Sequence, residues 1–180
     1  MALPATLRRF TIQLADSDRG IYEELDWRVP QHPSENERYL VARVLARALE
    51  HADGMEFSKG GVSDDEEPAI IQKNLRGEWL AWIEVGSPSP DRLHKAQKLA
   101  PRVAVYAWKN VDALADAIRE REVHRREELE LKSLPAETLD AIAATLDRVN
   151  KWDLSVAGGA IYLTINGALF ELAVTVIPIA

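Results

Sequence analysis

A single carboxylate lies near the end of the apolar run at residues 79–85, which reads WLAWIEV. Side chains alternate along a strand, so Leu80, Trp82 and Glu84 are predicted to share one face. A carboxylate in an apolar setting is costly to bury without a partner, and burial alone can raise its pKa by roughly 3–5 units. Glu84 is therefore expected either to reach solvent or an arginine, or to take part in chemistry that needs a carboxylate.

The loop before this strand supplies more acids, in the order Asp64, Asp65, Glu66 and Glu67. An acidic run is usually a solvated loop. A carboxylate from this loop that meets Glu84 can instead hold a hard divalent cation, because Mg²⁺ takes one or two protein carboxylates plus waters and substrate phosphate oxygens. The two acidic features together predict a Mg²⁺ or Mn²⁺ site as the alternative to a solvated loop.

Glu37 is a third candidate acid, within a segment that has the marks of a helix. At about 100° per residue it lies about 40° from Val41, on the apolar stripe of that helix. If the stripe faces a sheet, Glu37 faces the sheet too. The other interpretation is a capping box, in which Ser34 caps the helix and Glu37 follows three residues later.

Basic residues are concentrated in one segment, which contains no acid: Arg92, Lys95, Lys98, Arg102 and Lys109. A cationic helix after an acidic strand end can contact a phosphate while carboxylates hold a metal. Lysines on a surface helix also keep a protein soluble, which is the commoner explanation for any one of them. We expect at most weak contact with nucleic acid through the Arg92–Lys109 segment.

Composition excludes several classes of protein. The formal net charge of −7 argues against strong nonspecific binding to nucleic acid. No apolar run reaches the roughly 18 residues of a membrane span, and the start MALPATLRRF lacks the apolar core of a signal peptide, so we expect a cytoplasmic protein with no membrane contact. The absence of cysteine excludes disulfides, thiolate–zinc sites and cysteine nucleophiles. A length of 180 residues suits one domain over 1–180.

The elements that must position these residues follow from periodicity and turn signals. We predict a hairpin from strands 5–15 and 21–29, a helix within 32–54, strands at 55–62, 79–85, 102–108 and 127–134, and helices at 90–100, 111–122 and 135–149. Residues 69–75 fit either a helix or a strand. Three strands follow within 152–177, with turns at 158–159 and 166–167. The pattern predicts an α/β (α+β) fold in which a mixed central sheet is flanked by helices, with an N-terminal β-hairpin and a C-terminal β-meander.

Several motifs together resemble the YaeQ family of bacterial proteins: the start MALPATLRRFTIQLADSDRG, then HPSENER, FSKGGVSDDEEPA and WIEVGSPSPDRLHKA. The resemblance covers essentially the whole chain. It implies an elaborated version of the PD-(D/E)XK, or restriction-endonuclease-like, nuclease fold, whose core order is αβββαβ. In that arrangement we expect the strands ending near Val62 and Val85 to lie side by side, with the 90–100 helix packed on their sheet.

The resemblance also implies metal ligands. Asp65 best fits the first acid of the motif, with Asp64 as the alternative, and Glu84 fits the acid of the (D/E)XK tripeptide. These two carboxylates would bind Mg²⁺ or Mn²⁺. Glu37 fits the helical glutamate of such folds and would act through a water molecule.

The lysine of the tripeptide falls on Gly86, so this sequence departs from the standard motif. Similar variants move the lysine to the following helix, where Lys95 is the first choice and Lys98 the second. Lys95 would position the attacking water or stabilise charge on phosphorus. The expected activity is metal-dependent hydrolysis of a phosphodiester in nucleic acid. The alternative is a non-catalytic binding or regulatory module that keeps the nuclease-like fold.

Overall fold

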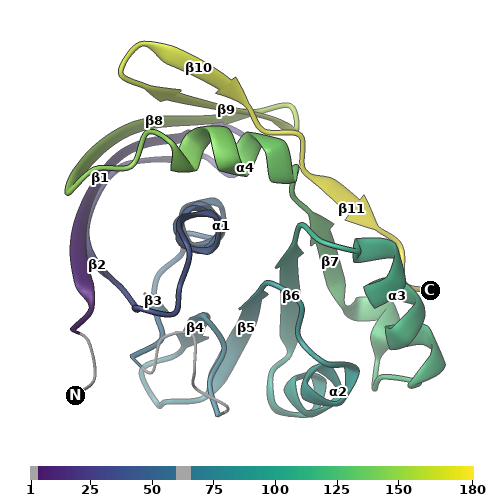
Figure 1. Ribbon diagram of the computed structural model, residues 1–180. Coiled ribbons are helices and arrows are strands. Elements are labelled where there is room, and N and C mark those ends of the chain that lie inside the picture. The colour runs from purple at the N-terminus through teal and green to yellow at the C-terminus, as the bar shows by residue number, and fades with distance from the viewer. Residues whose placement is uncertain (1–3, 60–65) are drawn as a thin grey trace. The chain divides into compact units, whose positions relative to one another are not determined.

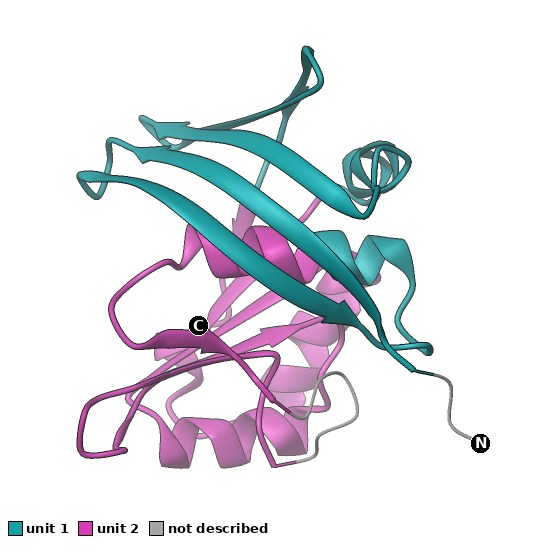
Figure 2. Ribbon diagram, turned by 90° about the vertical axis from the view of Figure 1, so that its left-hand side faces the viewer, with its two compact units in different colours: residues 1–41, 135–174 teal, residues 42–134, 175–180 magenta. Residues whose placement is uncertain are grey.

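The computed structural model describes residues 4–59 and 66–180 (Figure 1). The chain divides into two compact units, which Figure 2 shows in different colours. Unit 1 comprises residues 1–41 and 135–174, and unit 2 comprises residues 42–134 and 175–180. The expectation of a single domain over 1–180 stays a prediction. No helix in the described part of the chain is long and apolar enough to cross a membrane.

Unit 1 is built on a five-stranded sheet with the strand order β10-β9-β8-β1-β2. Its strands are β1 (Thr6–Asp16), β2 (Ile21–Gln31), β8 (Val149–Ala157), β9 (Ala160–Ile165) and β10 (Ala168–Glu171). The predicted N-terminal hairpin and C-terminal meander are both confirmed. They form one sheet because β1 also pairs with β8, in parallel.

Alternating side chains explain the position of this sheet's core. Phe10 and Ile12 of β1 are completely buried, and the Phe10 ring meets Trp152 of β8 edge-on at 5.1 Å between ring centroids. The residues on either side of this pair, Arg9 and Gln13, are exposed and belong to the other face of the sheet. One face of the sheet is therefore apolar and the other polar, as expected for a sheet with one solvated side.

Helix α1 (Glu37–Leu49) starts in unit 1 and continues into unit 2. Its cap is Asn36, whose Oδ1 accepts a hydrogen bond from the Tyr39 N–H at 2.8 Å. The predicted capping box is wrong, because the helix starts later than expected and the Ser34 hydroxyl bonds to the His32 ring at 2.7 Å instead. Glu37 is thus the first helical residue and not the third.

Helix α4 (Ala136–Ala143) belongs to unit 1 and buries Leu139 and Ile142. It is shorter than the predicted helix 135–149. The chain turns after residue 143, where the Leu146 N–H bonds to the Ala143 carbonyl at 3.1 Å, so that β8 can begin at residue 149. The pairing of β8 with β1 outweighs the helical preference of this segment.

Unit 2 contains a six-stranded mixed sheet with the order β11-β7-β6-β5-β4-β3. Its strands are β3 (Met55–Phe57), β4 (Ile70–Lys73), β5 (Trp79–Val85), β6 (Arg102–Ala107), β7 (Glu130–Ser133) and β11 (Thr175–Ile177). Strands β5, β6 and β7 run parallel, and the other pairings are antiparallel. The order α1, β3, β4, β5, α2, β6 confirms the predicted αβββαβ sequence of elements.

The expected adjacency of the strands ending near Val62 and Val85 is wrong. Strand β3 ends at Phe57, and Val62 lies outside the described residues. The ambiguous segment 69–75 provides strand β4, which lies between β3 and β5 because Ile70 pairs with both Phe57 and Ile83.

Helices α2 (Pro90–Leu99) and α3 (Val111–Glu120) cover one face of this sheet, where Trp82, Val105 and Leu131 pack against Leu93 and Ile118. The predicted packing of the 90–100 helix is confirmed. A 3₁₀ turn at Arg126–Glu128 precedes β7, so that strand is shorter than predicted.

Candidate functional site

Glu84 lies in unit 2 at the carboxyl end of β5, and only 6% of the residue is exposed. Trp82, two residues earlier on the same face, donates its Nε1–H to Glu84 Oε1 at 2.8 Å. Arg92 Nε donates a very short hydrogen bond to the same oxygen. Glu84 is therefore a buried carboxylate whose charge is balanced by an arginine, which is one of the two outcomes expected from the sequence.

Arg92 occupies the first turn of α2, where its backbone N–H bonds to the Ser89 cap at 3.2 Å. Its side chain is 22% exposed. Besides Glu84, its Nη2 donates to the backbone carbonyl of Glu67 at 2.8 Å. Arg92 thus ties the end of β5 to the acidic loop. The sequence predicted a lysine near Glu84 and not Arg92, whose place just after the Ser89–Pro90 helix start is the signal that indicates this contact.

The backbone conformation at residue 86 explains why this position holds glycine, where the standard motif has a lysine. The φ of Gly86 is 104°, a conformation that L side chains rarely adopt. Its N–H bonds to the Tyr106 carbonyl at 2.8 Å. The chain leaves β5 through this turn toward α2, which places a helical side chain beside Glu84.

The side chain of Glu67 connects the acidic loop to the neighbouring strands. Ser58 Oγ donates to Glu67 Oε2 at 3.3 Å, and Lys73 Nζ lies 3.8 Å from Oε1. The Lys73 ammonium lies 4.5 Å from the centroid of the Trp79 ring. Trp79 in turn packs on Trp82 at 5.0 Å between ring centroids. The contacts form a closed ring. It runs from Glu67 through Lys73, the two tryptophans, Glu84 and Arg92, and returns to Glu67.

The other acids and lysines predicted for this site do not contact Glu84 within the described residues. Asp64 and Asp65 lie outside the described residues. Lys95 is exposed, and its Nζ lies 3.4 Å from Glu66 Oε2. Lys98 is exposed as well. The cation that contacts Glu84 is thus Arg92, while Lys95 contacts an acid of the loop, and the catalytic role assigned to Lys95 stays a prediction.

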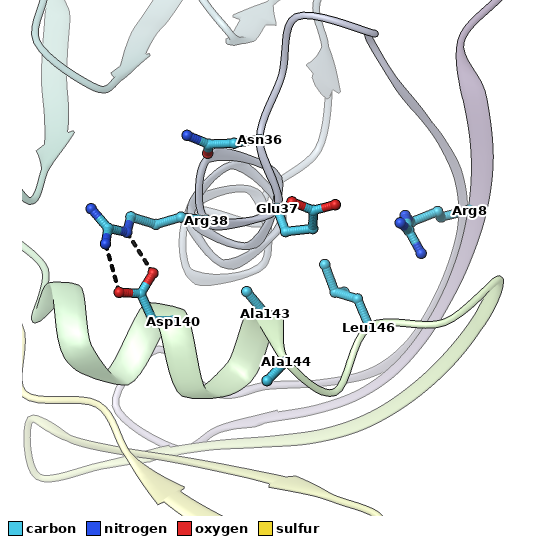
Figure 3. A pocket seen from close by; sticks show the side chains of 8 residues that line it. All are labelled: Arg8, Asn36, Glu37, Arg38, Asp140, Ala143, Ala144 and Leu146. Carbon is cyan, nitrogen blue, oxygen red and sulfur yellow. Dashed lines mark hydrogen bonds and ion pairs between the residues drawn. The ribbon is translucent and has the colours of Figure 1, made fainter.

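Glu37 lies in unit 1 and is exposed. Figure 3 shows its carboxylate pointing toward Arg8 and away from the ion pair of Arg38 with Asp140. These residues line a cavity of about 650 Å³ in unit 1, together with Asn36, Ala143, Ala144 and Leu146. Glu37 and Glu84 belong to different units, and a shared role of these two acids stays a prediction.

The basic segment does not form a continuous cationic surface. Arg92 and Lys95 form the ion pairs described above, and Arg102 pairs with Glu50 and Glu130 at 2.7 and 2.6 Å. Within the described residues, only Lys98 and Lys109 of the five form no ion pair. Most of the segment's positive charge is therefore paired with acids of unit 2.

A second charged cluster, which the sequence did not reveal, lies on the other face of the same sheet. Glu50 Oε1 accepts from the Tyr106 hydroxyl at 2.6 Å and from Lys132 Nζ at 3.2 Å, and Oε2 accepts from Arg102 at 2.7 Å. Arg102 and Tyr106 alternate with Val103 and Val105, which face α2 and α3. These polar residues are far apart in the sequence, so no spacing signal joined them.

This cluster controls the protonation of its members. Burial alone would raise the pKa of Glu50, but the hydrogen bond from Arg102 and the charges of Lys132 and Arg102 outweigh burial and lower this pKa to about 2. Burial, together with the charge of Glu50, raises the pKa of Tyr106. The cluster is thus a fixed arrangement of ionised Glu50 and neutral Tyr106, which suits a structural role.

Glu84 offers one carboxylate oxygen to a hard divalent cation. Both hydrogen bonds that Glu84 makes with described residues use Oε1, which leaves Oε2 as a ligand atom. Mg²⁺ needs only one or two protein carboxylates, whereas zinc prefers histidine and cysteine. Among residues 4–59 and 66–180, no three acidic or histidine side chains gather as a metal cluster. A cation here would rely on Glu84 and on the predicted ligand Asp65.

The chain is similar to several YaeQ proteins. A family model described as YaeQ protein matches residues 1–174. The YaeQ protein of Escherichia coli strain K12 is 29% identical over 177 residues, which cover 97% of each chain. The crystal structure of YaeQ from Pseudomonas syringae has a TM-score of 0.90 at 30% identity and covers 97% of both chains. That of YaeQ from Xanthomonas axonopodis pv. citri has a TM-score of 0.87 at 28% identity, covering 96% of this chain and 97% of that one. The chain belongs to the YaeQ family.

Proposed function

We propose that this member of the YaeQ family hydrolyses phosphodiester bonds of nucleic acid with the help of Mg²⁺ or Mn²⁺. One observation carries the proposal. Arg92 binds the Glu84 carboxylate and the Glu67 carbonyl together, which brings the backbone at Glu67 to the end of β5. Asp65 is two residues from Glu67 in the sequence, so the loop can deliver a second carboxylate to Glu84.

The roles of the residues follow from their contacts. Glu84 and Asp65 would hold the cation, and Trp82 and Arg92 orient Glu84 through Oε1. The bound metal would lower the pKa of a water molecule and stabilise negative charge on phosphorus. The guanidinium of Arg92 has donors in a planar fork that matches phosphate oxygens. Lys95 keeps its proposed role of positioning the attacking water.

A second candidate function is a non-catalytic binding module with the same fold. The ion pair between Glu84 and Arg92 supports it, because a buried carboxylate already paired with an arginine binds a cation less readily. The Lys95–Glu66 ion pair also supports it, because it engages the ammonium group that would act in catalysis. The two candidates differ in whether the protein binds metal.

A Mn²⁺ titration followed by calorimetry tests the metal site. Glu84→Gln removes the charge that would hold the ion and should weaken binding about tenfold or more, since charged ligands dominate binding of hard cations. Glu78→Gln is the matched control, because Glu78 is an exposed acid just before the same strand. Equal loss in both variants, or no loss in either, contradicts the assignment of Glu84.

An assay with single- and double-stranded DNA and RNA at low ionic strength tests the reaction. We expect slow, Mn²⁺- or Mg²⁺-dependent cleavage that Glu84→Ala abolishes and Lys95→Ala reduces strongly. Arg92→Lys should also reduce it, because lysine lacks the planar fork. Cleavage that persists in Glu84→Ala contradicts the proposed site, and the absence of both cleavage and metal binding favours the non-catalytic module.

A further inference from the structure

Unit 1 carries a group of exposed arginines on the solvent-facing side of its sheet. Arg9 of β1 lies directly opposite Arg28 of β2 and, on its other side, Val149 of β8. Arg148 immediately precedes Val149, and Leu7 is two residues from Arg9 on the same face. We call Leu7, Arg9, Arg28, Arg148 and Val149 the arginine patch. These five residues line a hollow of about 350 Å³.

The arrangement of charges in the arginine patch is unfavourable for the protein alone. Like charges directly opposite each other on neighbouring strands destabilise a sheet. Asp26 compensates Arg9 with two hydrogen bonds of 3.0 and 2.7 Å. No acid among the described residues forms an ion pair with Arg28 or Arg148. Asp26 also feels the charge of Arg28, but it is bonded to Arg9. In a chain with a net charge of −7, two arginines without an ion pair beside a third favour an anionic ligand.

The shape and composition of the arginine patch narrow the choice of anion. Guanidinium groups bind phosphate through two parallel hydrogen bonds. Leu7 and Val149 are 55% and 56% exposed, so the hollow also offers apolar surface beside the charges. Leu7, Arg9, Arg28 and Val149 are on paired strands. The Arg148 carbonyl accepts a hydrogen bond from the Arg9 N–H at 2.8 Å, so the backbone holds all five residues close together.

We propose that the arginine patch binds the phosphate backbone of nucleic acid. The choice of nucleic acid over another polyanion rests on the proposed function, whereas the anionic character of the ligand rests on the patch itself. The contact is independent of the metal site in unit 2. It gives an overall acidic protein a local surface of opposite sign with which to hold its substrate.

Fluorescence anisotropy with a labelled single-stranded oligonucleotide in EDTA tests the arginine patch. The double variant Arg28→Glu/Arg148→Glu should weaken binding about tenfold or more at low salt. Loss of two phosphate contacts should also reduce the slope of log affinity against log salt by about 1.4. The control Arg76→Glu/Arg121→Glu makes the same change in net charge at exposed residues of unit 2, outside the Arg92–Lys109 segment, and should leave that slope unchanged.

The outcomes separate this inference from the proposed function. Because EDTA removes metal, binding is measured without cleavage, and a protein that binds through the arginine patch but never cleaves contradicts only the proposed function. Equal weakening in the patch variant and in the control overturns the patch, as would unchanged binding in the patch variant. Tighter patch-dependent binding of polyglutamate or of anionic lipid vesicles than of the oligonucleotide overturns the choice of nucleic acid. Thermal melts of all variants check that they fold.

Discussion

At the scale of single residues, the sequence indicated the carboxylate but not its partner. Glu84 stood out because it interrupts an apolar strand. Arg92 did not, because its contact depends on the turn at Gly86 and on the angle at which α2 leaves that turn. Neither is encoded in a spacing rule. The proposed ligand Asp65 rests on sequence resemblance, since it lies outside the described residues.

Removing Arg92 should therefore reveal what it contributes to stability. Arg92→Ala leaves Glu84 buried without its ion-pair partner and should lower the free energy of unfolding by roughly 3 kcal/mol. Arg92→Lys keeps the charge but has a single nitrogen, which cannot reach Glu84 and the Glu67 carbonyl in the same way, so its cost should be smaller. Urea denaturation measures both values. A larger loss for the lysine variant than for the alanine variant would contradict this account.

Glu50 makes the stability of the protein depend on pH. Its pKa in the folded state is about 2, below its ordinary value of 4.5. The stabilisation is complete above about pH 4.5 and is lost as the pH falls toward 2, amounting to roughly 3 kcal/mol for the ionised group. The difference in unfolding free energy between wild type and Glu50→Gln should shrink between pH 6 and pH 3. A constant difference would show that the charge of Glu50 is not the cause.

At the scale of elements, local signals predicted most helices and strands but not their partners. Ser89 and Pro90 marked the start of α2, and the Asn166–Gly167 turn marked the β9–β10 hairpin. The parallel pairing of β1 with β8 was not predictable, because hydrophobic alternation shows that a strand has an apolar face but not which strand lies beside it. The shortening of α4 has the same origin, since tertiary pairing determines where β8 begins.

The start of α1 allows a direct comparison of the observed Asn36 cap with the capping box predicted at Ser34. Asn36→Ala should lower the free energy of unfolding by about 1 kcal/mol, because Oδ1 satisfies the Tyr39 N–H. Ser34→Ala is the matched control and should cost less, since its hydroxyl contacts the His32 ring in the loop. Thermal melts of the two variants at equal concentration measure the difference. A larger effect at Ser34 would restore the capping-box interpretation.

At the scale of the whole molecule, the chain passes between the two units three times. Unit 2 occupies the middle of the sequence, and residues 175–180 return to it after unit 1 is complete. Strand β11 pairs with β7, and Ile179 is 3% exposed in the core beside α3. Charge is also a property of the whole chain, because a net charge of −7 opposes any polyanion outside a local cationic surface.

The return of the chain to unit 2 predicts unequal effects of two similar substitutions. Ile179→Ala should cost about 2–4 kcal/mol, since it leaves a cavity in the core. Val176→Ala, three residues earlier, should cost less than about 1 kcal/mol because Val176 is 64% exposed. Chemical denaturation measures both. Similar values would mean that the segment after residue 174 contributes little to unit 2.

The pairing of β1 with β8 has a consequence for synthesis on the ribosome. Asp18 and Gly158, which bond across the end of these strands, are 140 positions apart in the chain. At translation rates of about 5–20 residues per second, the β1–β2 hairpin waits roughly 7–28 s for its third strand. During that interval Phe10 and Ile12 lack the cover of β8, and one edge of β1 has open backbone hydrogen-bonding groups. Until β8 is made, the hairpin exposes an apolar face and an open strand edge, which are the features that favour aggregation of a nascent chain.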